Sequence, residues 1–196
     1  ALSACGSSDD TSGSSSSASA SGGGAKKIAL LLPENKTARY EAFDKPMFEA
    51  AVKAGCPDCT VLYSNANQDA AKQQQQAEAA ITQGANVIVM SAVDGKSAVT
   101  IVQNAKSQGV PVIAYDRFIA GSDYYVSFDN KKVGELQGTG LVDAMKKNGK
   151  TSGDIVMING SPTDNNATLF KQGYQADIKD SGLVTVGEEA VPDWDN

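Results

Sequence analysis

The chain has 196 residues, 41% of them hydrophobic, which is enough for one domain or for one and a fraction. Its formal net charge of −6 and pI of about 4.6 disfavour nucleic acid or an anionic membrane surface as the main partner, because both favour basic patches. The sequence has no histidine, the commonest general acid–base catalyst and metal ligand, and no cluster has metal-ligand spacing. We therefore expect no metal and no cofactor.

Residues 1–24 are expected to be a tether outside the fold. Residues 6–24 contain only Ser, Gly, Ala, Thr and Asp, which cannot bury enough apolar surface to offset chain entropy. The preceding Leu2-Ser3-Ala4-Cys5 resembles the lipobox of bacterial lipoproteins. The resemblance implies that the signal is cut before Cys5, that its thiol carries a diacylglyceryl group, and that the sequence is trimmed at its start. A chance match beside a linker is the alternative.

The next part of the chain alternates apolar runs with helical patterns. The run Ile28–Leu32 is continuous, as expected of a strand that is covered on both faces. Asn67 or Asp69 should cap the second helix, whose glutamines 73–76 should form a solvated face. The predicted elements are a strand at 27–33, a helix from about 44 to 55, a strand at 60–65, a helix at 70–81, a strand at 86–90, and a helix from Asp94 or Gly95 to Gly109.

Two cysteines lie between the first helix and the second strand. Once Cys5 is assigned to lipid, Cys56 and Cys59 remain as an even pair, which could form a small disulfide in an oxidising compartment. A thioredoxin-like redox site is the other interpretation, but there the motif opens a helix. Here it follows Gly55, which resembles a helix C-cap, so we favour a structural pair.

The alternation continues to the end of the sequence. Asp129 and Asn130 are expected to cap the helix that follows the fifth strand. Unbroken strand–helix alternation is typical of an α/β fold, a parallel sheet with helices on both faces. The predicted elements are strands at 110–114 and 124–128, a helix over 133–145, a strand at 155–158, a helix at 166–179 and a strand at 183–186.

Polar side chains follow the strands of this predicted fold. The strand at 110–114 ends in Tyr115-Asp116-Arg117, and the carboxyl ends of parallel strands share the edge where ligands bind. A carboxylate acceptor and a guanidinium fork match the vicinal hydroxyls of a sugar. Tyr40 and Trp194 could face the apolar C–H side of the ring. An Asp–Arg ion pair at a strand end is the alternative.

Three segments, 115–117, 124–137 and 160–167, resemble the sugar-binding proteins of ABC transporters. These belong to the periplasmic-binding-protein class related to ribose-binding proteins, and the D-xylose-binding branch matches best. The resemblance runs from Lys26 to the end of the sequence. It implies a two-lobe fold with a hinge near Phe128–Asn130, a first lobe at 25–128 and a second at 129–196. Because family members continue beyond Asn196, we expect the second lobe to be incomplete.

Carried over position by position, the resemblance implies a set of ligand-binding residues. The family often has Trp where this chain has Tyr40, so the resemblance implies an aromatic ring stacked on the sugar at this position but leaves the strength of the stacking open. The implied sugar contacts are Arg39 and Tyr40 in the first loop, Asp116 and Arg117 at the strand end, Asp164 and Asn166 in the second lobe, and Trp194 stacked on the ring.

The resemblance implies a monomeric, non-enzymatic binding module. It would capture a monosaccharide, D-xylose foremost, and deliver it to an ABC permease while anchored by lipid outside the cytoplasmic membrane of a Gram-positive bacterium. A sugar sensor feeding a membrane kinase would use the same site. A nucleotide-dependent enzyme is disfavoured because residues 32–36 hold no glycine-rich phosphate loop. A sugar-responsive repressor would need a DNA-binding headpiece.

Overall fold

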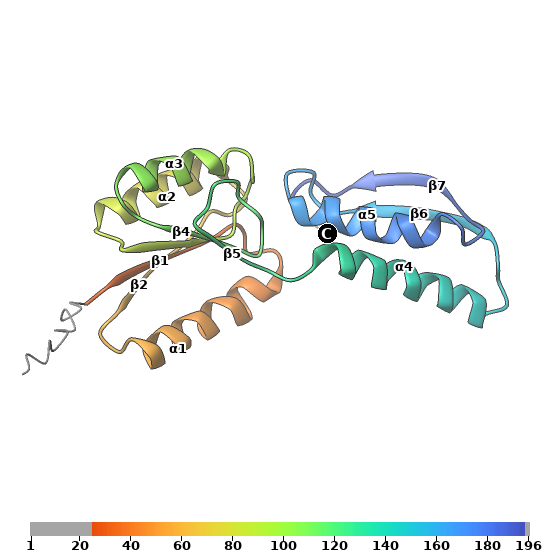
Figure 1. The fold of residues 1–196 in the computed structure, drawn as a ribbon, viewed down its shortest axis with the longest axis horizontal. Helices are drawn as coiled ribbons and strands as arrows, with labels where there is room; N and C mark the ends of the chain where they lie inside the picture. Colours follow the sequence, from red (N-terminus) through yellow and green to blue (C-terminus); the bar gives the residue numbers. More distant parts are fainter. Residues whose placement is uncertain (1–24, 195–196) are drawn as a thin grey trace, which may run out of the picture.

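The computed structural model describes residues 25–194, in which strands and helices alternate along the chain (Figure 1). The predicted tether 1–24 and the lipidation site Cys5 lie outside the described residues. Among the residues that are described, no helix combines the length and the apolar character needed to cross a bilayer.

Five parallel strands form the larger sheet, in the spatial order β2-β1-β3-β4-β5. The chain winds outward in both directions from β1, so the edge beside its carboxyl end is a switch point of the type at which α/β proteins bind ligands. The strands are β1 (Lys27–Leu32), β2 (Thr60–Asn65), β3 (Val87–Met90), β4 (Val112–Tyr115) and β5 (Tyr124–Val126).

Helices cover both faces of this sheet, which confirms the predicted α/β class. Helices α2 (Ala70–Thr82) and α3 (Ala98–Ser107) lie on one face, and α1 (Lys45–Gly55) lies on the other (Figure 1). Alternate residues of β1 enter the two cores: Leu31 packs on the α2–α3 side and Leu30 packs with Tyr40 and Phe48. The continuous apolar run of β1 is the sequence counterpart of this two-sided burial.

The rest of the chain forms a second α/β unit. Its parallel strands β6 (Gly153–Asn159) and β7 (Leu183–Ala190) pair with each other, and α4 (Asn130–Lys147) and α5 (Asn165–Ile178) pack together beneath them (Figure 1). Its core is Met157, Ile178 and Leu183. On the opposite face of the pair, the apolar side chains of Val156, Ile158, Val184 and Val186 are exposed.

Aspartate side chains cap helices α2 and α4. Asp69, not Asn67, caps α2 by accepting from Lys72 N at 2.9 Å. Asp129 caps α4 in the same way through Lys132 N at 2.9 Å. Helical structure begins a turn earlier than predicted, because the π-helical turn η1 (Tyr40–Asp44) runs directly into α1.

One prediction about α2 was wrong. Glutamines 73–76 were expected to form a solvated face, but Gln73 is only 1% exposed. It shares a helix face with Ala77 and Ala80, which are also buried, because residues four and seven positions apart lie on one side of a helix. Gln74 and Gln75 are exposed, as predicted.

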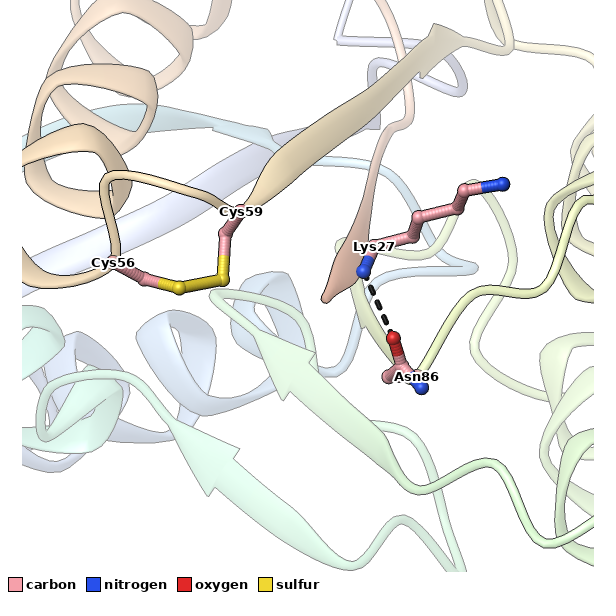
Figure 2. The surroundings of a disulfide bond; sticks show 4 residues. All are labelled: Lys27, Cys56, Cys59 and Asn86. Atoms are coloured by element: carbon pink, nitrogen blue, oxygen red, sulfur yellow. Dashed lines mark hydrogen bonds between the residues drawn. A yellow bond between two sulfur atoms is a disulfide. The ribbon is translucent and has the colours of Figure 1, made fainter. Parts of the chain in front are cut away.

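The structure joins Cys56 and Cys59 by a disulfide just before β2 (Figure 2). The bridge lies at the amino end of the strand, near the point where Lys27 N donates to Asn86 Oδ1 at 2.9 Å (Figure 2). The disulfide therefore constrains the short loop between α1 and β2, at the end of the sheet opposite to the strand carboxyl ends.

Candidate functional site

A cavity of about 180 Å³ lies between the two α/β units, where loops leave the carboxyl ends of their strands. This is below the roughly 300–1,000 Å³ of pockets for drug-sized ligands, so its size suits a smaller solute. All seven residues singled out as sugar contacts line it. The lining consists of Thr37, Arg39, Tyr40, Asp116, Arg117, Phe128, Asp164, Asn166, Phe170 and Trp194.

Asp116 sits at the centre of this lining in an unusual backbone conformation. Its φ of 65° is left-handed, which is uncommon for a residue other than glycine. Neighbouring groups hold the conformation: Asp116 N donates to Val126 O at 2.8 Å, and its carbonyl accepts from Ser127 Oγ at 2.9 Å. The tight turn ends β4 and lets two consecutive side chains, those of Asp116 and Arg117, both line the cavity.

The first loop supplies partners for the Asp116 carboxylate. Tyr40 Oη donates to Asp116 Oδ2 at 2.8 Å, and Arg39 Nη2 lies 3.2 Å from the same oxygen. Burial raises the pKa of Tyr40 well above its usual range, so the phenol stays a donor. Burial lowers the pKa of Arg39, but the negative charges of Asp116 and Asp44 and the neighbouring Tyr40 together outweigh this effect, and the net shift is upward.

Arg117 extends across to the second unit. Its Nε lies 3.1 Å from Asp164 Oδ2, and both side chains are at most 5% exposed. Its Nη1 donates to Ala92 O at 3.0 Å. Burial raises the pKa of Asp164, although the positive charge of Arg117 favours the carboxylate. Asp116 and Arg117 are therefore paired with Arg39 and Asp164, not with each other.

Asn166 and Trp194 complete the lining from the second unit. Asn166 Nδ2 donates to Asp116 O at 3.2 Å, and Asn130 Nδ2 donates to Asn166 Oδ1 at 3.0 Å. The Trp194 ring lies so close to Gly160 that a Cβ there would be 2.0 Å from Cη2. The indole is thus packed directly on backbone, in a place that only glycine leaves open.

Three lining residues are not among the ligand contacts expected from the sequence: Thr37, Phe128 and Phe170. A local signal existed for Phe170, because it lies one helical turn after Asn166 on α5 and so shares its face. The sequence places Phe128 at the end of the fifth strand and at the expected hinge, but not in the ligand site. Its exposure to the cavity depends on where β5 ends, two residues earlier than predicted.

The lining offers a defined chemistry. Carboxylates accept, guanidinium and amide groups donate, and aromatic rings provide flat apolar surfaces, which together suit a small neutral polyol. Within residues 25–194, no group of three or more Cys, Asp or Glu side chains is arranged to hold a metal ion.

Comparison with known proteins identifies relatives of this fold. The multiple sugar-binding periplasmic protein SbpA of Azospirillum brasilense is 44% identical over 133 residues, covering 64% of this chain and 37% of the relative. The D-xylose-binding periplasmic protein of Escherichia coli is 36% identical over 174 residues, covering 86% of this chain and 50% of the relative. These relatives are binding proteins, not enzymes.

A solved structure agrees with these relatives. An ABC transporter solute binding protein from Clostridium phytofermentans, with bound β-D-glucose, superposes with a TM-score of 0.74 at 31% identity, covering 82% of this chain and 51% of that protein. The chain spans 37% and 50% of the two curated relatives, and therefore at most about half their length. The family model described as periplasmic binding protein domain matches residues 28–196. The chain therefore belongs to the periplasmic binding protein domain family.

Proposed function

We propose that this chain captures a monosaccharide, D-xylose foremost, and delivers it to an ABC permease. The observation that carries the proposal is the meeting of hydrogen-bonding and aromatic side chains from both α/β units at one cavity. The names of the relatives support a sugar as the ligand: one binds D-xylose and another binds multiple sugars. Asp116, Arg117, Asp164 and Asn166 would bind hydroxyls, and Trp194 would stack on the ring.

The proposal divides the chain into a first lobe at 25–128 and a second at 129–196. The separate sheets and the single passage from β5 to α4 support this boundary. Closure would be driven by contacts that the ligand makes only when both lobes surround it. Asp116 and Arg117 come from the first lobe, and Asp164 and Asn166 from the second, so each lobe supplies an acceptor and a donor.

We also propose that the protein acts outside the cytoplasmic membrane, attached by a lipid on Cys5. The lipobox-like Leu2-Ser3-Ala4-Cys5 supports this attachment, as does the Ser/Gly-rich segment that follows it. A Gram-positive cell surface would suit such a tether, because a soluble binding protein would be lost there.

Sugar titration tests the binding function. We expect saturable binding of D-xylose, measured by calorimetry and by the fluorescence of Trp194, the single tryptophan, with D-ribose, L-arabinose and D-glucose as competitors. Arg117→Ala should weaken binding by at least about a hundredfold, because a buried charge-assisted contact is worth roughly 3 kcal/mol. Arg117→Lys keeps the charge but loses the planar fork, and should weaken binding by about tenfold.

Lys53→Ala is the matched control, because it removes one positive charge from an exposed position at the end of α1. It should bind sugar as the wild type does. Binding by Arg117→Ala with wild-type affinity, in a protein whose circular dichroism is unchanged, would contradict the proposed site. A folded wild-type protein that binds none of the four sugars would contradict the proposed function.

A further inference from the structure

Gln73 of α2 is a buried polar residue that lines no part of the cavity. Its two neighbours along the helix, Gln74 and Gln75, are exposed. Burying an amide side chain is unfavourable unless its donor and acceptor are both satisfied, so its partners show what it does.

Gln73 forms hydrogen bonds with the backbone on both sides of Ala92. Its Nε2 donates to Ser91 O at 2.8 Å, and its Oε1 accepts from Val93 N at 2.9 Å. The segment 91–93 directly follows β3 and has no regular secondary structure. The planar amide of Gln73 therefore fixes the backbone conformation of residues 91–93, where the chain leaves the sheet.

The segment 91–93 in turn contacts residues of the candidate site. Ala92 O accepts from Arg117 Nη1 at 3.0 Å, and Ser91 Oγ lies 3.5 Å from Tyr40 Oη. Val93 O accepts from Thr163 Oγ1 of the second unit at 3.3 Å. Each of the three residues held by Gln73 thus contacts a different side chain in or beside the cavity.

We propose that Gln73 is a positioning residue of the ligand site. By holding residues 91–93, Gln73 places two groups. The first is the Ala92 carbonyl, which orients the Arg117 guanidinium, and the second is the Ser91 hydroxyl, which lies beside Tyr40. Gln73 would touch no ligand itself and would act through Arg117. The inference rests on the proposed function, since it explains how a sugar contact is oriented.

Substitution at Gln73 tests the inference. Gln73→Met keeps the length of the side chain and removes both hydrogen bonds, so the 91–93 segment loses its support. We expect the dissociation constant for D-xylose to rise by about tenfold in calorimetry, the equivalent of one or two hydrogen bonds. Amide hydrogen exchange at Val93 should also become faster, because that N–H donates to Gln73.

Two variants of the same helix serve as controls. Gln75→Met makes the same chemical change at an exposed position and should leave affinity and Val93 exchange as in the wild type. Ala80→Gly weakens α2 at a buried position away from residues 91–93, and it reports what loss of stability alone does to affinity. If Gln73→Met fails to fold, Gln73→Glu replaces it, because a carboxylate still accepts from Val93 N but cannot donate to Ser91 O.

The outcomes are distinguishable. An affinity loss in the Gln73 variant no larger than that in Ala80→Gly, at equal loss of melting temperature, would overturn the positioning role. Unchanged exchange at Val93 would overturn it without any sugar being used. A wild-type protein that binds none of the four sugars would overturn the proposed function instead, and the exchange rate at Val93 would still decide whether Gln73 holds the segment.

Discussion

At the scale of single residues, the site depends on a glycine, Gly160, because a larger residue there would leave no room for the Trp194 ring. Gly160 follows β6 and leaves the space into which the Trp194 ring packs. Trp194 itself has a left-handed backbone with a φ of 56°, so its loop turns sharply back towards the cavity. The aromatic surface offered to a ligand is therefore set by backbone geometry at two positions that lie far apart in the sequence.

We expect Gly160→Ala to displace Trp194 and to weaken sugar binding by about tenfold or more. A Cβ would lie 2.0 Å from Cη2 and 2.4 Å from Cζ2 of the indole, closer than any real contact, so the ring has to move. The ring should become more hydrated, and the fluorescence emission of the sugar-free protein should shift to longer wavelengths. Gly55→Ala, where a Cβ would meet nothing within 4 Å, is the control. An unshifted emission spectrum in Gly160→Ala would show that the ring does not pack on Gly160.

At the scale of secondary-structure elements, α4 and α5 approach each other through glycines. A Cβ on Gly134 would lie 2.1 Å from Phe170 O, and one on Gly173 would lie 2.2 Å from Lys131 O. The backbones are thus in direct contact, which is possible only where a side chain is absent. This contact fixes α5, which carries Asn166 and Phe170 into the cavity.

We expect Gly134→Ala to lower the free energy of unfolding by about 1–3 kcal/mol, the usual cost of overpacking, in spite of the better helix propensity of alanine. Urea denaturation measures the change. Gly140→Ala is the matched control on the same helix, because a Cβ there would meet nothing within 4 Å. It should stabilise the protein by about 0.5–1 kcal/mol. Equal effects of the two substitutions would contradict the close helix contact.

At the scale of the whole molecule, a buried ion pair connects the two units. Besides the Arg117–Asp164 pair, two hydrogen bonds connect the units: Asn166 Nδ2 donates to Asp116 O, and Gly95 N donates to Thr163 O at 3.3 Å. Removing one partner of a buried pair leaves an uncompensated charge, at a cost of about 3–5 kcal/mol. Separation of the lobes would relieve this cost by returning the remaining charge to water.

We therefore expect Asp164→Asn to favour an open arrangement with a larger radius of gyration in small-angle X-ray scattering. Asparagine caps helices about as well as aspartate, so the cap that Asp164 provides to α5 should be kept while the charge is lost. Sugar affinity should fall by at least about tenfold, because closure then has to bury an unpaired Arg117. Asp154→Asn, at an exposed position of β6, is the control. An unchanged radius of gyration in Asp164→Asn would contradict a role of the pair in closure.

The main features of the fold could be predicted from local sequence. Continuous apolar runs such as Ile28–Leu32 identify buried parallel strands, and they do so because a strand covered on both faces has no polar side. Helix caps at Asp69 and Asp129 could be predicted because the capping hydrogen bond spans only three residues. The grouping of polar residues at strand ends follows from the shared direction of parallel strands.

The pairing of charges was decided by the tertiary structure alone. Asp116 and Arg117 are adjacent in sequence, yet each pairs with a residue that the fold brings from elsewhere. Gln73 is a different case: its helical spacing with Ala77 and Ala80 marks the buried face of α2, but its partners, Ser91 O and Val93 N, follow only from the fold. The sequence by itself thus determined the elements and the residues at the strand ends, because these depend on neighbours along the chain. The tertiary structure decided which of those residues meet, because contacts between residues far apart in the chain, such as Arg117 and Asp164, are set by packing.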